Sequence, residues 1–81
     1  MGYHIQKITK GELGEISKIE EEVMELKDAS EQGCKILEMV ELSDLYGAIE
    51  EYAMRKYGLQ MEDLKKMSDR TKEAFRSGDR K

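Results

Sequence analysis

The segment EEEVMEL at positions 20–26, taken together with ELSD at positions 41–44, decides the fold. Glu22 and Glu25 are three residues apart, and so are Glu41 and Asp44. Residues at this spacing share one face of a helix. Two such pairs on facing helices form an oxygen-rich pocket that suits a hard divalent cation. We therefore expect the rest of the chain to hold the two pairs opposite each other.

Helical periodicity predicts three helices, over residues 13–31, 34–57 and 61–76. In the first, apolar residues recur at steps of three and four from Ile16 to Leu26, which predicts one buried stripe. The second is apolar around most of its circumference, so it is expected to be central and buried. The glycines that follow each helix are expected to end it, with a left-handed cap at the first of them. These glycines are Gly33, Gly58 and Gly78.

The composition indicates one small all-α domain over residues 1–81. The chain has no proline, and 40% of its residues are charged, which favours long helices over sheets. The connections between the helices are short, so neighbouring helices are expected to pack antiparallel. Residues 1–12 are expected to form an extended N-terminal arm. His4, the only histidine, lies on this arm; a substrate role for it is the less favoured alternative, and it is not among the predicted site residues.

Composition also excludes several classes of protein. A single cysteine rules out an internal disulfide and a cysteine-based metal site. No apolar run approaches the length of a membrane span and no signal-peptide core is visible, so we expect a soluble, cytoplasmic protein without a membrane partner. The net charge of −4 disfavours nucleic acid as a partner. Basic residues do gather near the C-terminus, where they are either a solvated helix end or phosphate-facing: Arg70, Lys72, Arg76, Arg80 and Lys81.

The second carboxylate pair distinguishes this chain from an ordinary acidic surface helix. Glu41 and Asp44 interrupt an otherwise apolar helix, and an unpaired buried carboxylate is costly. Like charges about 4 Å apart repel by roughly 4 kcal/mol at an effective dielectric near 20, which a divalent cation would offset. All-oxygen ligation favours Mg²⁺ or Mn²⁺ over Zn²⁺ or Cu²⁺. From spacing alone, a metal site and a solvated acidic face both remain open.

The same residues carry a resemblance to a known family. EEVME at positions 21–25, followed by ELSD at positions 41–44, resembles the Glu-Glu-x-x-Glu … Glu-x-x-Asp signature of the MazG-like, all-α nucleoside triphosphate pyrophosphohydrolases. The similarity covers residues 15–55, and the tail from Met67 is similar to the ends of short, phage-type members. This resemblance implies hydrolysis of a (deoxy)nucleoside triphosphate to the monophosphate and pyrophosphate by attack of a metal-activated water.

The resemblance also implies roles for individual residues. Mg²⁺, with Mn²⁺ as a substitute, would be bound by Glu22, Glu25, Glu41 and Asp44. Catalytic roles would fall to Glu21 and Glu22, of which Glu21 would orient a ligand or help to activate water. The cations expected to hold the triphosphate are Lys18, Lys72 and Arg76, although the latter two also suit the C-terminal dipole of their helix.

Family sites are built in a four-helix arrangement, whereas this chain has room for three helices. We therefore expect a homodimer or homotetramer that completes a four-helix-type bundle through apolar faces of the second and third helices. Two alternatives remain beside a general nucleotide pyrophosphohydrolase. One is an enzyme like phosphoribosyl-ATP pyrophosphohydrolase, and the other is a non-catalytic helical adaptor that dimerises through its apolar stripes.

Overall fold

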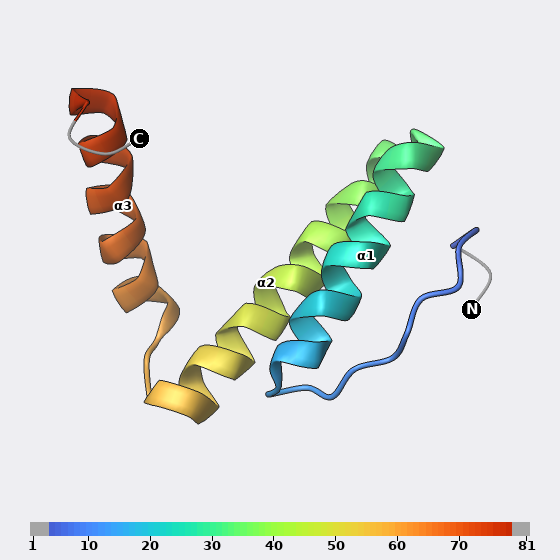
Figure 1. Cartoon of the computed structure of the whole chain (residues 1–81), viewed down its shortest axis with the longest axis horizontal. Helices are drawn as coiled ribbons and strands as arrows, with labels where there is room; N and C mark the ends of the chain where they lie inside the picture. The colour runs from blue at the N-terminus through green and yellow to red at the C-terminus, as the bar shows by residue number, and fades with distance from the viewer. Residues whose placement is uncertain (1–3, 79–81) are drawn as a thin grey trace.

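The computed structural model describes residues 4–78 and places three α-helices there, with no strand in that range (Figure 1). The helices are α1 (Ile16–Gln32), α2 (Lys35–Tyr57) and α3 (Met61–Ser77). The all-α prediction is confirmed, and so are the approximate bounds. Helix α1 begins three residues later than expected because Gly14 has a φ of 93°, which lies outside helical geometry. Within the described range, no helix is both long and apolar enough to cross a membrane.

Helices α1 and α2 form an antiparallel hairpin with a tight connection (Figure 1). Gly33 caps α1 in the left-handed conformation with a φ of 72°, and its N–H donates to the carbonyl of Ser30 at 3.1 Å. The helices approach through small residues, since Ala29, Ala48 and Ala53 are the buried apolar side chains among the described residues. This part of the antiparallel prediction is confirmed.

The interior of this hairpin is acidic. Besides the three alanines, the buried side chains of the described range are four carboxylates, Glu21, Glu22, Asp28 and Glu41. No large side chain in this range is fully buried. Buried carboxylates are rare unless they are paired or bound to a metal, so the packing itself marks this interface as unusual.

The prediction that the second helix is buried on all sides is wrong for the single chain. Its large apolar residues Ile36, Met39 and Tyr46 are 73%, 63% and 54% exposed. The reason is that α1 covers only one side of α2, and no other helix of the chain packs along its length.

Helix α3 departs from α2 at an open angle, as Figure 1 shows. Gly58 ends α2 with a φ of 66°, and α3 starts with a reciprocal capping box between Gln60 and Asp63. The expected antiparallel packing does not extend to α3 within one chain, because α3 does not pack along either of the other helices. Its apolar stripe therefore stays open, with Met67 58% and Phe75 50% exposed.

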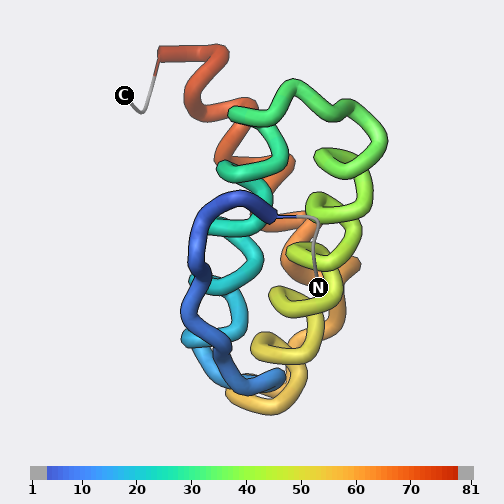
Figure 2. Tube along the Cα trace, turned by 90° about the vertical axis from the view of Figure 1, so that its right-hand side faces the viewer, coloured from blue at the N-terminus to red at the C-terminus, as the bar shows by residue number. Residues whose placement is uncertain are grey.

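The N-terminal arm, residues 4–15, runs back along α1 without secondary structure of its own other than turns (Figures 1 and 2). Carboxylates of α1 accept hydrogen bonds from its backbone at both ends. The N–H of Gly11 donates to Glu21 Oε1 at 2.9 Å, and the N–H of Ile5 donates to Asp28 Oδ2 at 3.1 Å. The arm is extended, as predicted, and it forms part of the hairpin surface. Residues 1–3 of the predicted arm lie outside the described range.

Candidate metal centre

The hairpin brings the two predicted carboxylate pairs together. Glu22 lies on α1, whereas Glu41 and Asp44 lie on α2, and an oxygen of each is within 4.8 Å of the others. Antiparallel packing of α1 and α2 produces this grouping. Glu25, the fourth predicted ligand, belongs to a second group that it forms with Glu41 and His4, with donor atoms within the same limit. Glu41 is thus common to both groups.

Two of these carboxylates have oxygens without partners. Glu22 and Glu41 are 5% and 4% exposed, and Glu22 Oε1 and Glu41 Oε1 are buried without a hydrogen-bond partner in the described part of the chain. A charged oxygen in this situation is costly, and buried polar atoms without partners call for an explanation such as a bound ion. An all-oxygen donor set of this kind suits a hard cation such as Mg²⁺ or Mn²⁺.

Burial also makes these groups harder to ionise. It raises the pKa of Glu22, and the adjacent Glu25 raises that pKa further. Burial likewise raises the pKa of Glu41, and it outweighs the opposing hydrogen bond and charge of His4, while the charges of Asp44 and Glu22 add to the increase. Such shifts mean that the carboxylates lack sufficient positive charge around them, which a divalent cation would supply.

Lys18 reaches the edge of this site from α1. Its Nζ lies 3.1 Å from Glu21 Oε1 and 3.4 Å from Glu22 Oε2. The hydrogen bond to Glu21 raises the pKa of Lys18 despite its partial burial. The predicted phosphate cation is therefore beside the carboxylates, and its ammonium group is engaged with two of them.

Glu21 is buried but belongs to neither group of candidate ligands. It accepts from the Gly11 N–H and from Lys18, and Lys10 Nζ lies 3.6 Å from its second oxygen. Burial raises the pKa of Glu21, but these hydrogen bonds outweigh it, so the net pKa is lowered. In this structure Glu21 anchors the arm to α1, and its role in water activation stays a prediction.

The two other predicted phosphate cations, Lys72 and Arg76, are exposed on α3. The structure does not bring them to the carboxylates, because α3 leaves the hairpin. On the same helix, a hydrogen bond from Lys65 lowers the pKa of Asp69, and the charges of Lys65, Lys72 and Arg76 lower it further. Arg80 and Lys81 of the basic tail lie outside the described residues.

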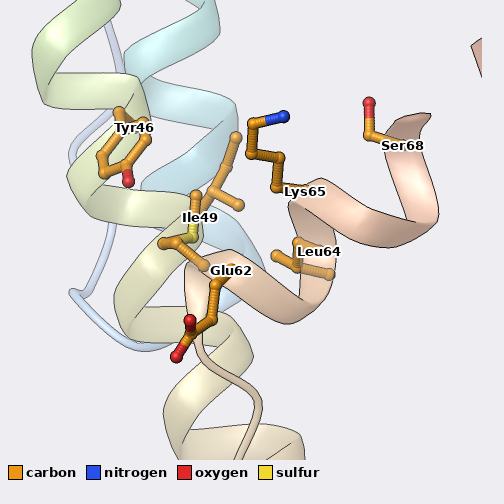
Figure 3. Close-up of a pocket in the computed structure, with 7 residues that line it drawn as sticks. Tyr46, Ile49, Glu62, Leu64, Lys65 and Ser68 are labelled. Carbon is orange, nitrogen blue, oxygen red and sulfur yellow. The ribbon is translucent and has the colours of Figure 1, made fainter.

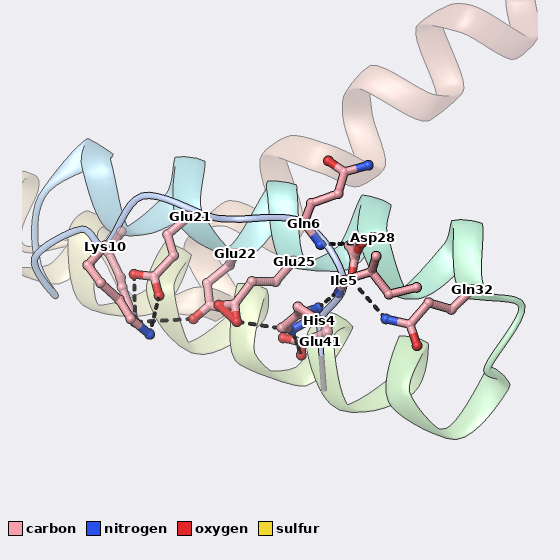
Figure 4. A network of polar contacts seen from close by, with 11 residues as sticks. His4, Ile5, Gln6, Lys10, Glu21, Glu22, Glu25, Asp28, Gln32 and Glu41 are labelled. Atoms are coloured by element: carbon pink, nitrogen blue, oxygen red, sulfur yellow. Dashed lines mark hydrogen bonds and ion pairs between the residues drawn. The ribbon is translucent and has the colours of Figure 1, made fainter. Parts of the chain in front are cut away.

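The structure adds two residues that the sequence did not assign to the site. His4 Nδ1 lies 2.9 Å from Asp28 Oδ2, while its Nε2 lies 2.9 Å from Glu41 Oε2 and 3.2 Å from Glu25 Oε2 (Figure 4). Asp28 was detectable in principle, because it follows Glu25 by three residues and so continues the same helix face. No local pattern places His4 there, since it reaches the site from the arm.

His4 and Asp28 stabilise each other's charged forms. Burial lowers the pKa of His4, but the hydrogen bonds to Asp28 and Glu41 and the charges of Glu41 and Glu25 give a net increase. Burial raises the pKa of Asp28, but hydrogen bonds from His4, Gln32 and the arm backbone lower it overall. The arm therefore places one imidazole between carboxylates of both helices.

Comparison of the chain with models of protein families, with curated proteins and with solved structures finds no match. The functional argument consequently rests on the residues and geometry of this site.

Proposed function

We propose that this chain is a Mg²⁺-dependent nucleoside triphosphate pyrophosphohydrolase of the MazG-like type. One observation carries the proposal: Glu22 and Glu41 face each other across the α1–α2 interface, almost fully buried, each with an oxygen that lacks a partner. They occupy positions of the Glu-Glu-x-x-Glu … Glu-x-x-Asp pattern. The same pattern supplies Asp44 next to them.

Energetics favours an enzyme over a purely structural role. Burying a carboxylate without compensation costs several kcal/mol, and an apolar residue at the same place would stabilise the hairpin. A helical adaptor gains nothing from such residues, whereas a cation site requires them. The donor set fits Mg²⁺ because it consists of carboxylate oxygens from two rigid helices.

Different residues of the chain have different roles in the proposed reaction. Glu22, Glu41 and Asp44 would hold the cation. A bound Mg²⁺ would neutralise charge on the triphosphate and lower the pKa of an attacking water. The water oxygen would bond to the α-phosphorus while the bond from that phosphorus to the α,β-bridging oxygen breaks. The products would be the monophosphate and pyrophosphate, and the proton lost by the water would pass to solvent. Lys18 is positioned at the site edge to offset phosphate charge, and we assign Glu21 to the orientation of the water.

The open apolar surfaces support the homo-oligomeric part of the proposal. Tyr46 and Ile49 of α2 and Leu64 of α3 line an open notch between the two helices (Figure 3). Met61 of α3 also lines it. Apolar side chains that remain exposed on both helices suit burial against a second copy. A homodimer or homotetramer would complete a four-helix arrangement, and the α3 of a partner would bring Lys72 and Arg76 toward the triphosphate.

The test is pyrophosphate release from a panel of ribo- and deoxynucleoside triphosphates and phosphoribosyl-ATP, with Mg²⁺ present. We expect Glu41→Gln and Asp44→Asn to reduce turnover by at least about 100-fold, since each removes charge from the cation site. Glu20→Gln is the control, because Glu20 is an exposed glutamate of α1 that belongs to neither group of candidate ligands and should retain full activity.

Two outcomes contradict the proposal. Wild-type rates in both site variants show that the carboxylates do not serve catalysis. Absence of cleavage across the whole panel, with a folded and Mg²⁺-loaded protein, favours the adaptor, for which the exposed apolar stripes are the supporting observation.

A further inference from the structure

The donor atoms around His4 have the spacing of metal ligands. Its Nε2 is 2.9 Å from Glu41 Oε2 and 3.2 Å from Glu25 Oε2. Around a six-coordinate divalent cation with bonds near 2.1 Å, neighbouring ligand atoms are about 3 Å apart. All three donor atoms lie within 4.8 Å of one another, a spacing that is compatible with a shared cation.

The other ring nitrogen of His4, Nδ1, has a carboxylate partner, as is usual for histidines that bind a metal. Nδ1 lies 2.9 Å from Oδ2 of Asp28, which is itself 3% exposed. Asp28 is fixed in turn by Gln32 Nε2 at 2.8 Å and by the Ile5 N–H at 3.1 Å. A carboxylate behind a histidine fixes its tautomer and directs the second nitrogen at the metal.

Glu41 links this position to the carboxylate site already described. Its Oε2 faces His4, while its Oε1 is buried and has no hydrogen-bond partner within the described residues. The two groups of candidate ligands therefore share one carboxylate, of which Oε1 is left without a partner by His4. Paired cations that share a ligand are common at sites of phosphate chemistry.

We propose that His4 is a metal ligand, and that His4, Glu25 and Glu41 form a second, mixed nitrogen–oxygen cation position beside Glu22, Glu41 and Asp44. Imidazole favours transition-metal ions over Mg²⁺, so this position prefers a transition-metal ion, for which Mn²⁺ serves as the spectroscopic probe. The inference rests on the proposed function insofar as Glu41 belongs to both positions. It makes the N-terminal arm a contributor to metal selectivity.

If His4 has a different role, its substitution changes the metal affinity in the opposite direction. If the imidazolium merely takes the place of a cation, then it competes with metal, and its removal strengthens metal binding. If Nε2 is a ligand, its removal weakens binding. The two roles are therefore separable by one substitution.

The experiment titrates the full chain with Mn²⁺ alone at one fixed pH and follows free Mn²⁺ by EPR. We expect His4→Ala to weaken Mn²⁺ binding by at least about tenfold, the usual scale for a damaged site, while Mg²⁺ binding changes little. Gln6→Ala is the matched control, because Gln6 is an exposed arm residue whose side chain bonds only Glu31. It should bind Mn²⁺ within about twofold of wild type.

A direct readout separates ligation from a structural effect of the arm. Pulsed EPR of bound Mn²⁺ detects nitrogen modulation when an imidazole is coordinated, and we expect this signal in wild type and Gln6→Ala only. Asp28→Asn keeps the shape behind His4 and should give an intermediate affinity with the modulation preserved. Mn²⁺ binding in His4→Ala that equals or exceeds wild type, or absence of nitrogen modulation in wild type, overturns the proposal.

The failure of this inference and that of the proposed function give different results. Asp44 belongs only to the carboxylate group, so Asp44→Asn should leave the nitrogen modulation in place. If the protein shows the nitrogen modulation but cleaves no nucleotide, the result supports the His4 site and contradicts the proposed enzymatic function. If the protein cleaves nucleotides but shows no nitrogen modulation, the result supports the proposed function and contradicts the His4 site.

Discussion

At the scale of single residues, this chain buries carboxylates at positions where small domains usually bury apolar side chains. Glu22, Glu41, Asp28 and Glu21 are buried between α1, α2 and the arm. Two of them, Asp28 and Glu21, are well supplied with hydrogen-bond donors, and their pKa values are lowered. Glu22 and Glu41 have raised pKa values and unpartnered oxygens, which is why we assign ion binding to them.

Neutralising Glu41 should stabilise the metal-free protein. Glu41→Gln removes a buried charge whose formation is disfavoured, so we expect a gain of about 1 kcal/mol near neutral pH, or several degrees in melting temperature. Added Mg²⁺ should raise the melting temperature of wild type but not of this variant, because only a folded cation site gains from the ion. Circular dichroism melts with and without Mg²⁺ measure both effects.

Glu20→Gln, which changes an exposed carboxylate, should match wild type in these melts. A melting temperature of Glu41→Gln far below that of wild type contradicts the assignment, since it means that the charge of Glu41 stabilises the metal-free fold.

The pKa shifts predict an unusual pH dependence for the metal-free protein. His4, Glu22 and Glu41 have raised pKa values, so their contribution to stability is lost as the pH rises through their folded-state pKa values. Asp28 and Glu21 have lowered values, so their contribution is lost only as the pH falls. The metal-free melting temperature should therefore be higher at about pH 5.5 than at about pH 8.

Added Mg²⁺ should reduce this difference, because a cation favours the ionised carboxylates and binds more tightly as the pH rises. Thermal melts in chelator at both pH values, repeated with Mg²⁺, measure the effect. A metal-free protein that is more stable at pH 8 would falsify the pKa directions on which this prediction depends.

At the scale of elements, the N-terminal arm is attached to α1 mainly by polar contacts. Glu21 accepts a hydrogen bond from the Gly11 N–H. Asp28 accepts hydrogen bonds from the backbone N–H groups of Ile5 and Gln6 and is also hydrogen-bonded to the His4 ring. Gly11 lies so close to α1 that a Cβ on it would overlap the backbone of Ser17 and Lys18. The arm can therefore follow α1 only with glycine at this position.

Substitution of Gly11 should displace the arm. Gly11→Ala forces the chain away from α1 and removes the N–H donor from buried Glu21, at a cost of about 1–3 kcal/mol. The His4 imidazole resonances in NMR spectra should shift toward those of an exposed histidine. Thr9→Ala, at an exposed residue of the same arm, should leave both stability and these resonances unchanged, and unchanged resonances in Gly11→Ala contradict the predicted clash.

At the scale of the whole molecule, the single chain leaves much apolar surface open. Exposed large side chains occur on α2 and α3, and α3 packs along neither of the other helices. A small domain with so little buried apolar surface gains stability from association. The open angle between α2 and α3 therefore suits a fold that is completed by a second copy.

Disruption of this surface should change the oligomeric state. We expect wild type to sediment as a dimer or tetramer at micromolar concentration, and Tyr46→Lys to shift it toward monomer, because Tyr46 lines the notch between α2 and α3. Analytical ultracentrifugation measures this shift, and the melting temperature should fall with it. Glu50→Gln, at an exposed polar residue of α2, changes the net charge by the same one unit and is the matched control, and a monomeric wild type contradicts the prediction.

The sequence by itself determined the helices and the pairing of their carboxylates. Helical hydrogen bonds are local, so periodicity and the glycines Gly33, Gly58 and Gly78 were enough to predict the three elements and their ends. The short connection between α1 and α2 made an antiparallel hairpin the expected arrangement. From that arrangement, the proximity of Glu22 to Glu41 and Asp44 followed.

Only the tertiary structure decided the path of the arm and the direction of α3. His4 meets residues 24 and 37 positions away, Asp28 and Glu41, and no local pattern encodes contacts of that range. Helix α3 was expected to pack antiparallel, but within the described residues it packs along neither α1 nor α2. Local hydrogen bonds fix helices, whereas the docking of an arm or a helix depends on surfaces formed only when distant segments meet.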